Sequence, residues 1–282
     1  MDRDRWETFL EKHLTPADQA FPSVPPVPGD WKTLSPVDSL PLLLDLTQAQ
    51  LAGDIRPTCE CFTALAIRAM PLLCYRRHLL CDVLLETEEG PGLFAFIYGQ
   101  SGVWPLDLTS KALFRLNSVY GDPATSPAAA LEYLHLFTGF IIGGAENGRF
   151  RVLESPDYFP WVDADPPPQA LDAVRQALSK VSYPPRVTCA DDEADAAVRQ
   201  ASAPAPATLH SGDLAEQRCL NSDVDSPVVA WHIQVPVVYG RSLWDCDFTV
   251  LRDGEVHMEE DRTLLDDLPL RLERFIGAVR LP

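Results

Sequence analysis

Residues 228–258 read VVAWHIQVPVVYGRSLWDCDFTVLRDGEVHM, and the alternation of side chains in this stretch decides the fold. Apolar residues recur at every second position in two runs, as they do in a β-strand that buries one face. The first run holds Trp231, Ile233, Val235, Val237 and Tyr239, and the second holds Trp244, Cys246, Phe248 and Val250. Between the runs, Gly240-Arg241 has the composition of a two-residue type II′ turn, which begins with glycine. The pattern therefore predicts an antiparallel hairpin.

The two-residue turn also predicts the register of this hairpin. It places apolar residues opposite each other in the pairs Val237 with Trp244, Val235 with Cys246, Ile233 with Phe248, and Trp231 with Val250. A slip by one residue would turn both apolar sets to the wrong face. Because Pro236 lacks a backbone N–H and falls opposite Asp245, we expect the first strand to lie at an edge of the sheet.

A third strand is expected after a second turn, at Arg252-Asp253-Gly254. Three residues that end in glycine suit a type I turn closed by a glycine bulge. This turn keeps Val256 and Met258 on the apolar side of the meander. The opposite, polar face then carries two rows of side chains, with His232, Thr249 and His257 in one row and Gln234, Asp247 and Glu259 in the next.

The sharpest chemical feature of the sequence is Asp247 facing Glu259 on this polar face. A like-charge pair costs stability unless a cation, a proton or bulk water relieves the repulsion. The candidate catalytic residues are Asp247, Glu259, His257 and His232, and the candidate metal ligands are His257, Asp247 and Glu259. The alternative is an ordinary solvated sheet face, which is common in antiparallel sheets.

Other sequence signals for chemistry are weaker. Cys246 belongs to the apolar face of the meander, whereas His232 and His257 belong to the polar face, so no base is expected beside this thiol. No glycine-rich phosphate loop precedes a helix, and no cofactor is expected.

Composition limits the class of protein and its partners. The chain has 282 residues, of which 46% are hydrophobic, and this is enough for one large domain or two modest ones. The formal charge of −18 argues against nucleic acid and anionic membranes as partners, because both are bound through lysine and arginine clusters. The longest apolar segment, residues 128–142, is too short to span a bilayer. Seven cysteines and the absence of an export signal favour the cytoplasm.

The chain divides into four predicted segments. Residues 1–41 combine a helical stripe at 5–14 with a proline-rich arm, which can form only an extended wrap. Residues 42–155 form an α+β half with a first meander and a central helix. Residues 156–226 form a Pro/Ala/Asp-rich excursion with one helix, and residues 227–282 form the C-terminal meander and a final helix. The pattern leaves open whether the two halves form one domain.

Within these segments, hydrophobic periodicity predicts the individual elements. Strands are expected at residues 79–86, 93–98, 103–106 and 149–154, and helices at residues 38–52, 58–70, 127–142, 169–181 and from 269 onward. Meanders that alternate with amphipathic helices predict an α+β fold, in which antiparallel sheets pack on the helices and a curved sheet clasps one of them.

Three stretches resemble segments of a group of uncharacterised bacterial proteins. They are PLDLTS at 105–110, YLHLF at 133–137 with GRFRVLES at 148–155, and YGRSL at 239–243 with DGEV at 253–256. The resemblance covers about half of the chain. It implies a bacterial cytoplasmic protein and carries no activity that could be transferred to particular residues.

Two functions are compatible with this pattern. The first is a non-enzymatic binding or interaction module, which would use its sheet to bind a protein or small-molecule partner that the sequence does not specify. A homodimer is also conceivable, through the proline-rich arm or through pairing of the edge strand that holds Pro236. The alternative is a metal-dependent or acid–base hydrolase that uses the carboxylate and histidine cluster of the C-terminal meander.

Overall fold

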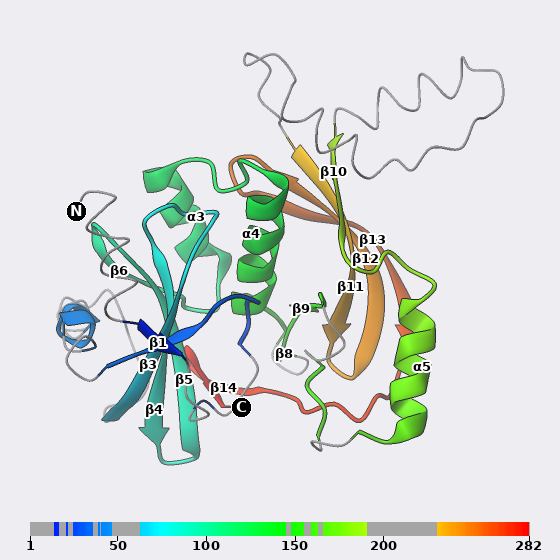
Figure 1. The fold of residues 1–282 in the computed structure, drawn as a ribbon, viewed down its shortest axis with the longest axis horizontal. Helices are drawn as coiled ribbons and strands as arrows, with labels where there is room; N and C mark the ends of the chain where they lie inside the picture. Colours follow the sequence, from blue (N-terminus) through cyan, green and yellow to red (C-terminus); the bar gives the residue numbers. More distant parts are fainter. Residues whose placement is uncertain are drawn as a thin grey trace.

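The computed structural model of the chain describes residues 14–16, 21, 25–35, 39, 41–46, 63–144, 148–154, 159–162, 166–190 and 230–281. Two antiparallel sheets lie on opposite sides of a central helix, α4 (Pro127–Phe140), as Figure 1 shows. Side chains from both sheets and from α4 form one hydrophobic core. The fold is the predicted α+β fold, with antiparallel meander sheets packed on helices.

The first sheet contains the predicted first meander. Its strands are β1 (Leu14–Pro16), β2 (Lys32–Leu34), β3 (Thr63–Pro71), β4 (Leu79–Thr87), β5 (Gly90–Gly99), β6 (Gly102–Pro105), β14 (Arg274–Ile276) and β15 (Val279–Leu281). They follow the order β1-β2-β3-β4-β5-β15-β14, and β6 also pairs with β5. The strands predicted at residues 79–86, 93–98 and 103–106 are confirmed. β5 starts at Gly90, earlier than predicted, because Thr87 pairs with Gly90 across a tight turn.

The second sheet contains the C-terminal meander. Its strands are β10 (Arg186–Cys189), β11 (Ala230–Tyr239), β12 (Ser242–Leu251) and β13 (Val256–Leu265), in that order, and β9 (Arg151–Val152) pairs with part of β11. All the predicted apolar pairs of the hairpin are confirmed. Gly240 has a φ angle of +62°, as the first central residue of a type II′ turn requires. In the second turn, the Gly254 N–H donates to the Leu251 carbonyl at 2.9 Å, and the Leu251 N–H donates to the Glu255 carbonyl at 2.8 Å, which is the predicted glycine-bulge closure.

The helices cover the sheet faces between and beside the two meanders. The helix predicted from residue 127 is α4, and the Ser126 side chain caps its start by accepting a hydrogen bond from the Ala129 N–H at 3.2 Å. The predicted helix at 169–181 is α5 (Pro168–Leu178), and residues 41–46 are helical as expected. Helix α3 (Ser110–Tyr120) was not predicted. Between α4 and β9, a small hairpin forms from β7 (Ile142–Gly144) and β8 (Gly148–Arg149). No helix in the described part of the chain is long and apolar enough to cross a membrane.

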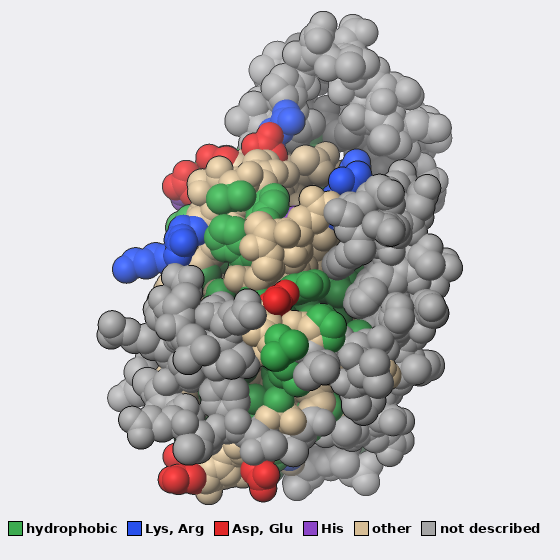
Figure 2. Space-filling view, turned by 90° about the vertical axis from the view of Figure 1, so that its left-hand side faces the viewer, with side chains coloured by type: hydrophobic (Ala, Val, Ile, Leu, Met, Phe, Trp, Pro, Cys, Tyr) green, Lys and Arg blue, Asp and Glu red, His purple; other side chains and the backbone are tan. Residues whose placement is uncertain are grey.

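Both outer flanks of the molecule have smaller hydrophobic cores of their own. Leu42 and Leu46 pack on the outer face of the first sheet, against residues of β3, β4 and β5. Figure 2 views the molecule from this side, where apolar side chains gather toward the centre of the face around an acidic group, and further acidic side chains lie at its upper and lower ends. On the other flank, Val174 and Leu178 of α5 pack with Leu268 and Leu270, which follow β13.

Two segments predicted as helices are strands. The described part of 58–70 belongs to β3, which pairs with β2 on one side and β4 on the other. Short runs of alanine and leucine fit either period, and here the two neighbouring strands decide the conformation. The segment after Pro269 forms the hairpin β14–β15, which turns at Gly277 with a φ angle of +57°. This segment crosses from the second sheet back to the first (Figure 1), where Arg280 pairs with Leu93 of β5.

The prediction that β11 lies at an edge is wrong. β10 pairs with β11 as far as Gln234, and β9 pairs with it from Val237 onward. Pro236 falls in the gap between these two short strands, where its missing N–H is not needed, and its carbonyl accepts a hydrogen bond from the Leu153 N–H at 2.9 Å. Pairing of β11 with a second copy of the chain is therefore blocked.

Several predictions fall on residues outside the described ranges. They include the helical stripe at 5–13, the end of the Leu-rich helix at Gly53, and the excursion between residues 191 and 229. Leu14, the last residue of the predicted stripe, is in β1.

Candidate functional site

A groove of about 350 Å³ lies on the polar face of the second sheet. The three long strands of that sheet and the short strand β10 contribute to it. The side chains and backbone that line it belong to Arg186, Thr188, His232, Ile233, Gln234, Asp247, Phe248, Glu259 and Glu260. This volume is within the range of small-ligand sites in proteins.

Strand pairing explains why these side chains gather. Arg186, Gln234, Asp247 and Glu260 face one another in a single row that crosses β10, β11, β12 and β13. Thr188, His232, Thr249 and His257 form the adjacent row. Because residues that pair directly point to the same face, the predicted polar face follows from the confirmed register.

One part of the predicted register is wrong. Thr249 faces His257 and Phe248 faces Met258 as expected, but Asp247 faces Glu260 instead of Glu259. The pairing shifts between Asp247 and Phe248, which leaves Glu259 as the extra residue of a β-bulge. The apolar alternation stops after Met258, so no apolar residue marked the position of this shift.

The bulge changes which residues belong to the groove. Glu259 and Glu260 both line it, so the site contains a second carboxylate from β13 that the predicted register did not place there. His232, Asp247 and Glu259 are brought to the same groove, whereas His257 is not among its lining residues. His257 instead lies 3.3 Å from the Glu255 carboxylate, and about half of its side chain is exposed.

The described residues do not assemble the predicted metal site. No group of three or more His, Cys, Asp or Glu side chains within the described ranges is arranged to hold a metal ion. The Nδ1 atom of His232 lies 3.1 Å from the hydroxyl of Thr249, its neighbour across the strand pair. This hydrogen bond orients the imidazole along the row.

The groove has an acidic balance. Asp247, Glu259 and Glu260 place three carboxylates beside the single guanidinium of Arg186, which leaves a formal excess of two negative charges with His232 neutral. In the next row, Asp245 is already paired with Arg262 at 2.8 Å. The groove therefore attracts cationic groups.

Comparison of the chain with protein families, curated proteins and solved structures finds no match. The chemistry of the site is then the guide to function.

The described cysteines do not add a nucleophile to this chemistry. Cys74, Cys81, Cys189 and Cys246 are free and buried. Burial, with a contribution from Asp261, raises the pKa of Cys246 to about 12, so its thiol stays protonated at neutral pH. Cys246 belongs to the core, as its place in the alternating pattern predicted.

Substitution of Glu260 by glutamine is expected to stabilise the fold, because it removes a like charge from the position opposite Asp247. Cross-strand pairs of this kind are worth about 0.2–1 kcal/mol, and the gain should shrink at high salt. Urea denaturation of Glu260→Gln at low and high salt measures this effect. The control is Glu88→Gln, at an exposed turn of the first sheet. Lower stability of Glu260→Gln than of the parent at low salt would contradict the pairing.

Proposed function

We propose that this protein is a non-enzymatic interaction module that binds a basic, extended segment of a protein partner at β13 and the adjoining groove. The observation that carries this proposal is the position of an acidic, open edge strand directly beside an acidic groove.

The edge strand offers hydrogen-bonding groups to a partner. β13 is the last strand of its sheet among the described strands, and it spans ten residues. Its residues from His257 to Thr263 are all exposed. Unpaired backbone N–H and C=O groups along such an edge can accept an added strand, and alternate side chains of that strand then reach the neighbouring face.

The charge of this edge selects the partner. Glu259 and Glu260 lie on the strand itself, and Asp247 lies one strand further in. A second copy of this chain would bring the same acidic side chains to the contact and be repelled. Lysine or arginine at alternate positions of a partner segment would meet these carboxylates. The charge of β13 therefore favours a basic partner over a homodimer through this edge.

A short fluorescein-labelled peptide with lysine at alternate positions and threonine between them tests the proposal. Fluorescence anisotropy is expected to show saturable binding that weakens as salt is added. In the double variant Glu259→Gln/Glu260→Gln, binding should weaken about fivefold, as the loss of two exposed charge contacts of about 0.5 kcal/mol each implies.

The matched control is the double variant Glu88→Gln/Glu89→Gln. It removes the same net charge from an exposed turn of the other sheet. If both double variants lose affinity equally, the binding reflects net charge alone and the proposed site is rejected. A peptide with glutamate in place of lysine should not bind.

A second function is favoured by one observation, namely that His232, Asp247 and Glu259 line the same groove. A histidine with two carboxylates can perform acid–base hydrolysis. Turnover of chromogenic esters or phosphate esters that is lost in both His232→Ala and Asp247→Asn would support this alternative. Turnover that survives in both variants would locate the activity elsewhere.

A further inference from the structure

A cluster of buried arginines connects the two sheets. It contains Arg68 of β3, Arg149 of β8, Arg151 of β9 and Arg280 of β15, with the carboxylates of Asp82 and Glu273 between them. Each of the four arginine side chains is at most 10% exposed. Among the described residues, four guanidiniums against two carboxylates leave a formal excess of two positive charges.

This excess is concentrated around Glu273. Arg149 holds the Glu273 carboxylate with two hydrogen bonds, from Nε at 2.6 Å and from Nη2 at 2.7 Å. Arg151 adds a third hydrogen bond at 3.0 Å, and Nε of Arg280 lies 3.9 Å from the same carboxylate. One negative charge thus faces three positive ones. By contrast, Arg68 pairs closely with Asp82, at 2.6 Å.

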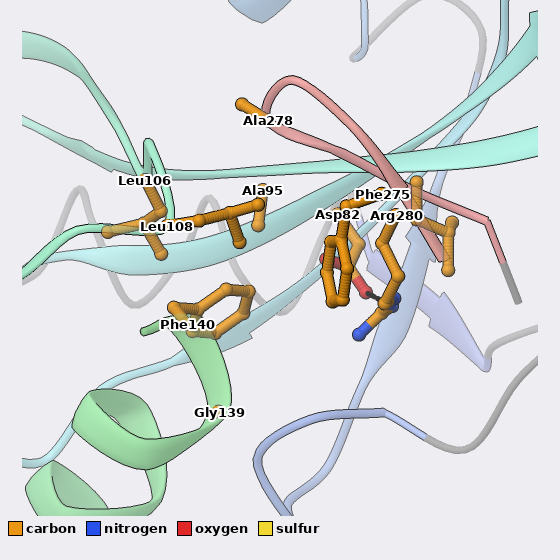
Figure 3. A pocket seen from close by; sticks show the side chains of 10 residues that line it. Asp82, Ala95, Leu106, Leu108, Gly139, Phe140, Phe275, Ala278 and Arg280 are labelled. Atoms are coloured by element: carbon orange, nitrogen blue, oxygen red, sulfur yellow. Dashed lines mark hydrogen bonds and ion pairs between the residues drawn. The ribbon is translucent and has the colours of Figure 1, made fainter. Parts of the chain in front are cut away.

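The guanidinium of Arg280 has donors that the described residues do not satisfy. Its Nε and Nη1 atoms are buried and form no hydrogen bond within the described part of the chain. In Figure 3 this guanidinium lies beside Asp82, at a cavity that Phe140 and Leu106 also line. The cavity measures only about 10 Å³, which is the space of a single water molecule. An anion larger than this must approach the cluster from another side.

A second pocket offers that approach. It measures about 30 Å³ and is lined by Arg149, Arg151, Arg271 and Glu273, with Gly148 and Gly240 among its other residues. Arg271 is exposed, so the pocket opens to solvent at that residue. Both oxygens of the Glu273 carboxylate already accept hydrogen bonds from Arg149, and Arg151 adds one more. Arg271, at the rim, donates from Nη2 to the Val162 carbonyl at 3.1 Å, so its guanidinium has no carboxylate partner among these contacts.

Burial and mutual repulsion both disfavour the positive charges of the cluster. Burial, followed by repulsion from Arg149, lowers the pKa of Arg151 to about 9. The same two causes, with Arg149 again the repelling group, lower the pKa of Arg280 to about 10. An anion bound beside Arg149 and Arg151 would offset this repulsion.

We propose that the pocket of Arg149, Arg151 and Arg271 binds a single oxyanion group, either a phosphate or a carboxylate. Planar guanidiniums bind both groups with paired, charge-assisted hydrogen bonds. The ligand carries the negative charge that the described cluster lacks, and it binds where the C-terminal segment joins β8 and β9. This site is separate from the groove on β10–β13, so its test is independent of the proposed function.

Thermal unfolding in millimolar sodium phosphate, compared with sodium chloride at equal ionic strength, tests this site. Phosphate is expected to raise Tm saturably, by about 5 °C near saturation. A parallel titration with sodium acetate distinguishes the two chemistries, since a carboxylate site responds to acetate and a phosphate site does not. A rise in Tm no larger than that in sodium chloride, with both probes, would overturn the proposal.

Arg271→Gln and Arg175→Gln form the matched pair of variants. Both remove one positive charge from an exposed position, but Arg175 lies on α5, paired with Asp172. Arg271→Gln should lose most of the phosphate response, while Arg175→Gln should keep it. An unchanged response in Arg271→Gln would mean that phosphate acts as a general stabilising salt, and the site would be rejected.

Discussion

Replacement of Glu273 by glutamine is expected to lower the free energy of unfolding by about 3–5 kcal/mol. The change removes the carboxylate that Arg149 and Arg151 hold and leaves two buried guanidiniums without it. A buried charge without a partner has lost its hydration and receives no compensation from the protein. Urea or guanidinium denaturation, followed by circular dichroism, measures the loss.

The same carboxylate predicts how stability depends on pH. Burial alone would raise the pKa of Glu273, but Arg149, Arg280 and Arg151 lower it from 4.5 to about 2. A carboxylate whose folded-state pKa is lowered stabilises the fold above its unfolded pKa, and that stability is lost as the pH falls through the folded-state value. About 3 kcal/mol should therefore disappear between pH 4.5 and pH 2. This acid-induced loss should be smaller in Glu273→Gln.

The control for Glu273→Gln is Glu89→Gln. Glu89 also forms an ion pair with an arginine, Arg274, at 3.2 Å, but both side chains are about half exposed or more. Solvent-exposed pairs contribute about 0–1 kcal/mol. Equal losses of stability in the two variants would show that the buried ion pairs of Glu273 stabilise the fold no more than an exposed ion pair does.

Replacement of Gly254 by alanine is expected to cost about 2–5 kcal/mol. Gly254 has a φ angle of +90°, which strains an L-residue by about 1–2 kcal/mol. A Cβ atom there would also lie less than 3.0 Å from the side chains of Asn117, Tyr133 and Pro123. Overpacking of this kind costs about 1–3 kcal/mol more. Thermal and chemical denaturation measure the sum.

The surroundings of Gly254 explain why this contact cannot relax easily. The Tyr133 hydroxyl donates to the Gly254 carbonyl at 3.0 Å and accepts from the Asn117 side chain at 2.9 Å. Asn117 in turn accepts a hydrogen bond from Tyr75. These buried groups join the second turn of the meander to α3, α4 and the loop before β4, so a shift at Gly254 would disturb both sheets.

Gly121 provides the matched control for this prediction. Its φ angle of +84° is close to that of Gly254, but a Cβ atom there would meet nothing within 4 Å. Gly121→Ala should therefore show the backbone cost alone. A loss as large as that of Gly254→Ala would show that the contacts around Gly254 contribute nothing.

The sequence predicted the hairpin register of β11 and β12 because a period of two, a buried face and a two-residue turn allow only one pairing. It predicted α4 because apolar residues recur at helical spacing from residue 127 onward. It also placed His232, Asp247 and Glu259 on one polar face, and the structure brings them to one groove. These features depend on side-chain patterns and turn residues within a short segment of the chain, so the sequence of that segment is enough to predict them.

The tertiary structure alone decided the remaining features. β3 and the β14–β15 hairpin are strands because existing sheet edges pair with them, although their side chains also fit a helix. The bulge at Glu259 lies among charged residues, where no buried side chain constrains the register in the sequence. The arginine cluster joins strands that are far apart in the chain, and its net charge becomes visible only when they meet. The local sequence determines how apolar and polar side chains alternate along a segment. Strands distant in sequence determine which strand that segment pairs with and which charged side chains are buried together.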